Sequence, residues 1–152
     1  MTRCQAAIDI GLLVVYSTNG GMPFWHASVV KNTAHMVASE DILVNLDCGN
    51  LVGRDFGLDI VRRMQSGYKV LQYEYGDGTC GRIACRRVDF LDLNGYDEDA
   101  LPFGGQDVDW MARLRLHHNV GQRAWRLRVG AKAVLNSKEE TIKEVGPQHR
   151  IA

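Results

Sequence analysis

Short apolar runs alternate with helix-spaced apolar positions along the first fifty residues. Residues 11–16 (GLLVVY) and 41–47 (DILVNLD) form nearly continuous apolar runs, which are typical of strands buried on both faces of a sheet. Between them, apolar residues recur at steps of three and four over residues 25–38, which is the period of a helix. The order strand, helix, strand predicts a βαβ unit with two parallel strands.

The predicted helix over residues 25–38 carries an apolar stripe beside a polar one. We expect the apolar stripe to pack on the sheet, and its members are Ala27, Val30, Ala34 and Val37. The polar stripe contains Lys31, Asn32 and His35. Such a stripe is usually a solvated face. The competing interpretation is that it meets a diphosphate or a nucleotide base.

The rest of the chain continues the alternation of elements. The pattern predicts helices over residues 55–65, 88–93 and 106–117 and strands over residues 70–75, 82–86, 124–129 and 131–135. The inward faces of the first and last of these helices are expected to hold Leu58, Val61 and Met64, and Trp110, Met111 and Leu114. The alternation favours a Rossmann-like α/β domain with a mixed, mostly parallel central sheet.

The composition restricts the chain to one globular domain, residues 1–152. A chain of 152 residues has the ordinary size of one domain, and its 18 basic residues balance 18 acidic ones. This neutrality gives no electrostatic sign of a nucleic-acid or anionic-membrane binder. The sequence has no apolar run of about eighteen residues and no signal-peptide pattern. Its four cysteines form no zinc-type pair. We therefore expect no membrane span and a ligand that is recognised locally.

Two aspartates stand where chemistry is expected. Asp47 follows an apolar run, and ligands of open α/β sheets bind beyond the carboxyl ends of strands. Its carboxylate can bind sugar hydroxyls or a divalent cation, or it can simply cap its own turn. Asp107 follows a glycine hinge, Gly104 and Gly105, in the first turn of a predicted helix. It can act as a general base if it faces a cleft, although the helix dipole alone also favours acids there.

A glycine-rich turn over residues 78–82 is a third candidate site. Gly81 permits close backbone approach, and Arg82 supplies a guanidinium that can fork onto phosphate oxygens. The alternative is a plain hairpin. His117 and His118 are interpreted as the basic end of a helix, interacting with its terminal carbonyls.

Several segments together carry a resemblance to a known family. Residues 81–98 combine a glycine-led strand, a short helix and an Asn-Gly-Tyr turn, and residues 104–109 read GGQDVD. Upstream, residues 24–32 resemble a helix placed against a nucleotide, and residues 45–50 (NLDCGN) stand where an Asp-x-Asp motif is expected. In this order and spacing the chain resembles the carboxyl-terminal domain of beta-1,4-galactosyltransferases and related family 2 glycosyltransferases of the GT-A fold. The resemblance covers residues 11–138 and leaves 139–152 as a charged tail.

The resemblance implies transfer of a sugar, with inversion, from a nucleotide-diphosphate donor to an acceptor hydroxyl on a glycan or another molecule. The expected nucleotide is UDP, and the general base would be Asp107. The donor would be bound by Lys31, Asn32, Asp47, Gly81 and Arg82. The acceptor would be bound by Phe103, Gly104, Gly105 and Asp109, with Phe103 stacking on a sugar ring. A Mn²⁺ or Mg²⁺ ion would be held by Asp47, Asn50 and Asn136. Family members are often in the Golgi lumen, which applies to a fragment of a longer member, and otherwise we expect the cytoplasm.

The sequence departs from the family pattern in ways that bear on activity. Gly49 replaces the second aspartate of Asp-x-Asp, and Asn136 stands where relatives place a metal-ligating histidine. Both changes weaken the expected metal site, because an amide binds manganese poorly. Gln106 replaces a glutamate beside the proposed base. By the resemblance we expect the family's first strand and helix to be missing, since the run at residues 11–16 is already close to the start of the sequence.

Two alternatives to an active transferase stay open. The first is a catalytically inactive module that binds a nucleotide sugar or a carbohydrate. The second is an interaction domain that recruits a partner through the sheet edge beside residues 11–16. The transferase hypothesis itself requires that Asp47 and Asp107 open onto one crevice.

Overall fold

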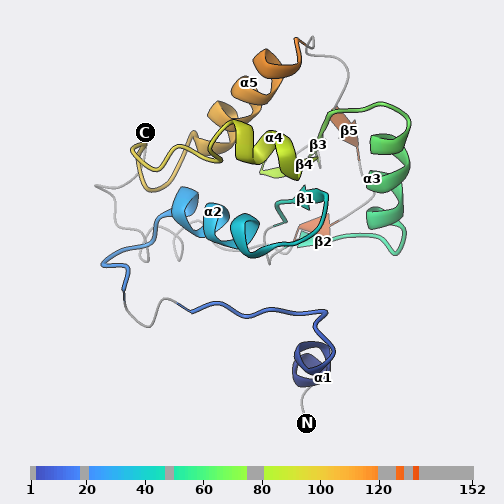
Figure 1. The fold of residues 1–152 in the computed structure, drawn as a ribbon, viewed down its shortest axis with the longest axis vertical. Helices are drawn as coiled ribbons and strands as arrows, with labels where there is room; N and C mark the ends of the chain where they lie inside the picture. Colours follow the sequence, from blue (N-terminus) through green and yellow to red (C-terminus); the bar gives the residue numbers. More distant parts are fainter. Residues whose placement is uncertain are drawn as a thin grey trace.

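A computed structural model describes residues 3–17, 21–46, 50–74, 81–119, 126–128 and 132–133 (Figure 1). Its helices are α1 (Arg3–Asp9), α2 (Ala27–Val37), α3 (Phe56–Gln65), α4 (Arg87–Asp92) and α5 (Gln106–His118). Its strands are β1 (Ile42–Val44), β2 (Asn50–Leu51), β3 (Val70–Glu74), β4 (Arg82–Arg86), β5 (Arg126–Arg128) and β6 (Lys132–Ala133). Every helix and strand predicted from residue 25 onward is confirmed in its described residues, and the ends of several predicted strands lie outside them.

The central sheet is mixed, with strand order β1-β4-β3-β5. β4 pairs antiparallel with both β1 and β3, and Cys85 is the register partner of Leu43 on one side and of Val70 on the other. β3 pairs parallel with β5, and β2 forms a separate antiparallel pair with β6. The chain is therefore α/β, but the predicted mostly parallel sheet is wrong for the described strands. An apolar run reports burial on both faces, and it does not report the direction of a strand.

Residues 11–17 do not form the predicted strand. The segment leads from α1 toward α2 and lies apart from the sheet (Figure 1). Leu12 is 80% exposed and Val14 is 70% exposed. A strand needs a neighbour to pair its backbone N–H and C=O groups, and residues 11–17 have no ladder partner among the described strands. The predicted βαβ unit is therefore not formed, and the sheet edge expected beside residues 11–16 does not exist in this form.

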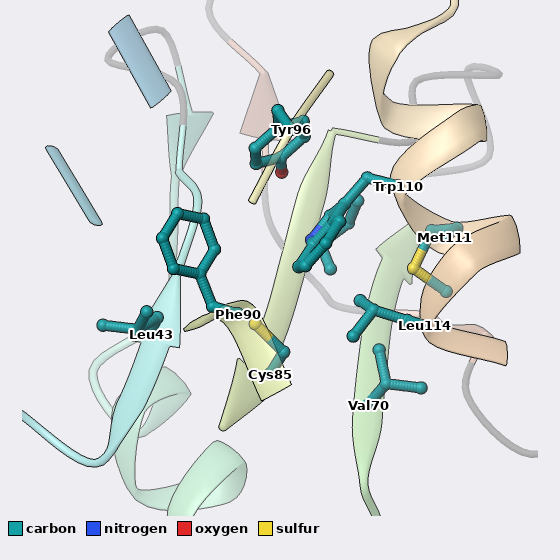
Figure 2. Packing of buried hydrophobic residues seen from close by; sticks show 9 residues of the cluster. Leu43, Val70, Cys85, Phe90, Tyr96, Trp110, Met111 and Leu114 are labelled. Atoms are coloured by element: carbon teal, nitrogen blue, oxygen red, sulfur yellow. The ribbon is translucent and has the colours of Figure 1, made fainter. Parts of the chain in front are cut away.

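The core lies on both faces of the β3–β4 pair. Val70, Ile83 and Cys85 point to one face, where they meet α4 and α5, and Leu71 and Ala84 point to the other, where they meet α3. Figure 2 shows the first face, with Trp110, Met111 and Leu114 of α5 directed toward the strands beside Phe90 of α4. These α5 residues are the ones predicted to face inward. Because helices cover both faces of the sheet, apolar and polar residues do not alternate along β4.

Of the three α3 residues predicted to face inward, only Met64 does so. Ile60 is buried with Phe56 and Met64 packed beside it, whereas Leu58 is 54% exposed and Val61 is exposed. Positions 56, 60 and 64 are four apart and therefore also lie on one helix face. The helix carries two apolar stripes, and contact with Leu71 and Tyr73 of the sheet selects the stripe that contains Ile60.

α2 turns its polar stripe inward, and of the predicted apolar stripe only Ala27 is buried. Its buried residues are Ala27, Ser28 and His35. Met36 and Val37 are more than half exposed. The expectation that Val30, Ala34 and Val37 pack on the sheet is wrong, because these residues instead border an outer groove together with residues 11–17. None of the described helices is both long enough and apolar enough to cross a bilayer.

Candidate active site

The first turn of α5 and the middle of α2 meet in an ion pair. Lys31 Nζ lies 2.6 Å from Asp107 Oδ1, and the two side chains are only 12% and 15% exposed. The ammonium also lies 5.2 Å from the centre of the Tyr96 ring, within range of a cation–π contact. The partners are 76 positions apart in the sequence. The structure thus joins the predicted general base to a predicted donor-binding residue.

A glycine hinge sets the direction from which Asp107 enters this site. Gly104 and Gly105 have φ angles of 104° and 80°, which L side chains rarely adopt. The backbone N–H of Gly104 donates to Gln106 Oε1 over 2.8 Å, and Gln106 is nearly buried. Asp107 follows in the first turn of the helix, where the macrodipole favours a carboxylate. The amide of Gln106 therefore stabilises the hinge through a hydrogen bond and adds no charge beside Asp107.

The segment before the hinge is attached to α2. The backbone N–H of Ala27, the first residue of α2, donates to the carbonyl of Pro102 over 2.8 Å. Phe103 follows and is half-buried. This contact fixes the start of α2 beside the approach to α5. The predicted acceptor residues Phe103, Gly104 and Gly105 thus lie on the same connection as Asp107.

Asn32 serves the scaffold of the site. Its Nδ2 donates to the carbonyl of Tyr96 and its Oδ1 accepts from the N–H of Tyr96, both over 2.8 Å. Nδ2 also donates to Glu98 Oε1 over 2.7 Å. A Cβ atom on Gly95, whose φ is +65°, would lie 2.5 Å from Asn32 Oδ1 and 2.7 Å from the Phe90 ring. Asn32 was expected to bind the donor, and its polar atoms here hold α2 to the turn after α4.

Asp109 also has a scaffold partner. Its Oδ2 accepts from Arg113 Nε over 2.8 Å, four residues further along α5. Arg113 Nη1 donates in addition to the carbonyls of Gly95 and Leu93, over 2.7 and 3.1 Å. Asp109, Arg113, Asn32 and Glu98 line a hollow of about 430 Å³. The hollow offers carboxylates, an amide and a guanidinium to a polyhydroxylated molecule.

Gly81 and Arg82 lie away from solvent. The carbonyl of Gly81 accepts from Asn45 Nδ2 over 2.6 Å, and Arg82 is 2% exposed within β4. The other predicted residues fall outside what is described. Asp47 and Asn136 lie outside the described residues, and Asn50 is described only as a backbone position of β2. The crevice expected between Asp47 and Asp107 is therefore not tested, and the same holds for the predicted metal ligands.

The apolar groove on the outer side of α2 is a separate feature. It has a volume of about 730 Å³, and its lining includes Leu12, Val14, Val30 and Val37. Neither Lys31 nor Asp107 lines it. The groove is the consequence of the apolar stripe facing outward, and it is not the candidate active site.

The sequence interpretation missed a cluster around Asp89. This carboxylate is 1% exposed, and it accepts from Arg86 Nε over 2.8 Å and lies 3.0 Å from His118 Nε2. Burial acts to raise the pKa of Asp89, but the contacts with Arg86 and His118 outweigh it and hold the pKa below its usual value. His117 Nε2 is 3.8 Å from the same carboxylate. Adjacent histidines at a helix end were a visible signal, but their partner on α4 was not.

The chain matches no protein-family model, and searches of curated proteins and of solved structures found no match. The resemblance to galactosyltransferases therefore remains an expectation drawn from the sequence motifs. The contacts among α2, α5 and the turn after α4 are observed in the structure itself and do not depend on any relative.

Proposed function

We propose that the chain is an inverting glycosyltransferase domain of the GT-A type, which moves a sugar from a nucleotide diphosphate to an acceptor hydroxyl. The observation that carries the proposal is the Lys31–Asp107 ion pair. The motif interpretation assigned a base to one of these positions and a donor-binding cation to the other. A base and a cation within one site are what a single-displacement transfer needs.

The chemistry follows from the two side chains. Lys31 contacts Oδ1 of Asp107, so we assign the acceptor proton to Oδ2. As Oδ2 takes that proton, the acceptor oxygen forms a bond to the anomeric carbon, and the bond from this carbon to the diphosphate breaks. The electron pair of that bond leaves with the phosphate oxygen, and the configuration inverts. The Lys31 ammonium stabilises the negative charge that develops on the leaving group.

The hollow beside the ion pair supports an acceptor site. It shares Asn32, the neighbour of Lys31, and it contains Asp109, two residues beyond Asp107. Carboxylates and a guanidinium are suitable partners for sugar hydroxyls. We therefore propose that the acceptor is held between this hollow and the hinge, with Phe103 on the same connection.

A second candidate function is a silent module that binds nucleotide sugars. The specific observation in its favour is the same ion pair, because Lys31 already occupies one oxygen of the proposed base. The substitutions at Gly49 and Asn136 point the same way, since they weaken the expected metal site. Both functions include binding of a nucleotide sugar, but only the transferase transfers the sugar to an acceptor.

An assay with the full chain separates these functions. UDP-sugar turnover is measured with a panel of glycan acceptors, with and without Mn²⁺, beside calorimetry of UDP-sugar binding. We expect turnover that Asp107→Asn reduces by at least about 1,000-fold while binding persists, because an amide cannot accept the proton. The matched control is Asp55→Asn, an exposed aspartate before α3 whose side chain makes no capping bond. Binding without turnover in the unmodified chain supports the silent module, and a chain without binding or turnover contradicts both.

A further inference from the structure

The second cluster of charged groups lies at the other end of α5. Asp107 stands in the first turn of this helix and His117 and His118 in the last, so the two sites are separated by about 16 Å along the helix axis at 1.5 Å per residue. We propose that Asp89, His117 and His118 form a binding site for a late first-row divalent metal, with Zn²⁺ as the representative ion. The proposal is independent of the transferase function.

The ligand atoms are already gathered for a metal. One ligand atom from each residue can be chosen so that all three lie within 4.8 Å of one another. Ligand atoms about 2.1 Å from a tetrahedral Zn²⁺ are about 3.4 Å apart. His118 Nε2 lies 3.0 Å from Asp89 Oδ2, and His117 Nε2 lies 3.8 Å from the other oxygen, Oδ1. The widest separation has to close by about 1.4 Å. We expect rotation of the two imidazole rings to close this gap.

The chemistry of the donors selects the type of ion. Two imidazole nitrogens and one carboxylate are a set that suits zinc and its neighbours, whereas magnesium and calcium prefer oxygen ligands. The His118 side chain is nine-tenths buried. Its Nε2 forms no aligned hydrogen bond within the described part of the chain. Its contact with Asp89 Oδ2, over 3.0 Å, lies within the proposed site, so a metal that binds both groups displaces no partner outside the cluster.

The surroundings of the cluster are suited to a cation. The C-terminal end of a helix carries partial negative charge, and both histidines are in the last turn of α5. The His117 side chain is 34% exposed, so an ion can enter from solvent and a water molecule can complete four-coordination.

Arg86 is the opposing charge in this cluster. Its guanidinium donates to both oxygens of Asp89, but a carboxylate has about four acceptor positions. Arg86 takes one position on each oxygen, which leaves others for a metal. In this arrangement Arg86 orients the ligating carboxylate, as hydrogen-bonded outer partners do in metal sites, and its charge limits the affinity.

The test is calorimetric titration of the chelator-treated full chain with ZnCl₂. We expect about one equivalent of Zn²⁺ to bind, with an affinity reduced by at least about tenfold in His117→Ala and in His118→Ala. The matched control is His26→Ala, a histidine before α2 outside the cluster, which should leave the affinity unchanged. The histidine variants carry the test because Asp89→Asn also disturbs Arg86, and circular dichroism confirms that each variant is folded.

A second measurement distinguishes this site from the cysteines. Co²⁺ bound by nitrogen and oxygen gives visible bands without the thiolate charge-transfer band of a cysteine ligand, and we expect the former spectrum. The proposal is overturned by any of three results: no Zn²⁺ binding to the folded chain, an affinity in both histidine variants equal to that of the unmodified chain, or a thiolate band. It is supported by binding that both histidine substitutions weaken.

Discussion

The two faces of α2 contrast in a way that the sequence did not suggest. The inner face carries Lys31, Asn32 and His35, each engaged with α4, α5 or the turn between them. The outer face carries Val30, Ala34 and Val37, which border the outer groove, and Val37 is more than half exposed. A helix buries the face whose partners are in place, and a polar face with specific partners can displace an apolar face without them. Stability and chemistry should therefore depend on the inner polar face.

The largest effect is expected from acid acting on His35. The pKa of His35 falls from 6.5 to about 4, chiefly because burial disfavours the charged ring. A hydrogen bond with the Lys31 backbone partly opposes this shift, and the Lys31 charge contributes to it. The unfolded chain therefore binds a proton more readily than the folded chain. The contribution is fully present above about pH 6.5 and is lost as the pH falls through 4, by about 3 kcal/mol in total.

Urea unfolding of the parent chain and His35→Gln at pH 7 and pH 4 measures this contribution, since the variant has no imidazole to titrate. NMR titration reports the pKa of His35 directly. An ordinary pKa near 6.5 would show that the ring is not enclosed by Phe90 and Tyr96 as the 5.0 and 6.2 Å ring separations indicate.

The next effect is expected from Asn32→Ala. This substitution removes two hydrogen bonds to the backbone of Tyr96, a residue that is 1% exposed. We expect the free energy of unfolding to fall by about 2 kcal/mol, because each bond contributes about 1 kcal/mol and a backbone group is left unpaired. The control is Thr33→Ala, whose hydroxyl only returns to the Val29 carbonyl of the same helix. Equal losses in both variants would contradict the scaffold role of Asn32.

A smaller effect is expected from the Lys31–Asp107 ion pair. Both partners are partly shielded from solvent, so their coupling should exceed that of a surface pair and fall short of a fully buried one, at about 1–2 kcal/mol. The double-mutant cycle of Lys31→Met and Asp107→Asn, measured by urea unfolding, gives this coupling. A value near zero would mean that the two side chains do not meet in solution.

The smallest effect is expected on the outer face. Val37→Gln should change the free energy of unfolding by no more than about 0.5 kcal/mol, because Val37 is 52% exposed. The same urea titration measures it. A loss above about 1 kcal/mol would show that the outer face is covered and would cancel the contrast between the two faces.

The sequence predicted the elements of the sheet well and their arrangement poorly. β4 was predicted with the bounds that it has, since the residues of a doubly covered strand are marked by local composition. Its antiparallel partners were not predicted, because strand direction depends on connections and on neighbours far away in the chain. The run at residues 11–16 has the same local pattern but is not a strand. A strand must pair with a neighbouring strand, and local composition does not determine whether such a neighbour is available.

The candidate site divides in the same way. The motif GGQDVD by itself placed Asp107 after a glycine hinge in the first turn of a helix, because φ preferences and the helix dipole act over a few residues. Only the tertiary structure determined that Lys31 pairs with Asp107 and that Asn32 forms hydrogen bonds with Tyr96. The same holds for the cluster of Asp89 with His117 and His118. These contacts join side chains that are far apart in the chain, and their geometry is set by how helices pack on the sheet rather than by local preference.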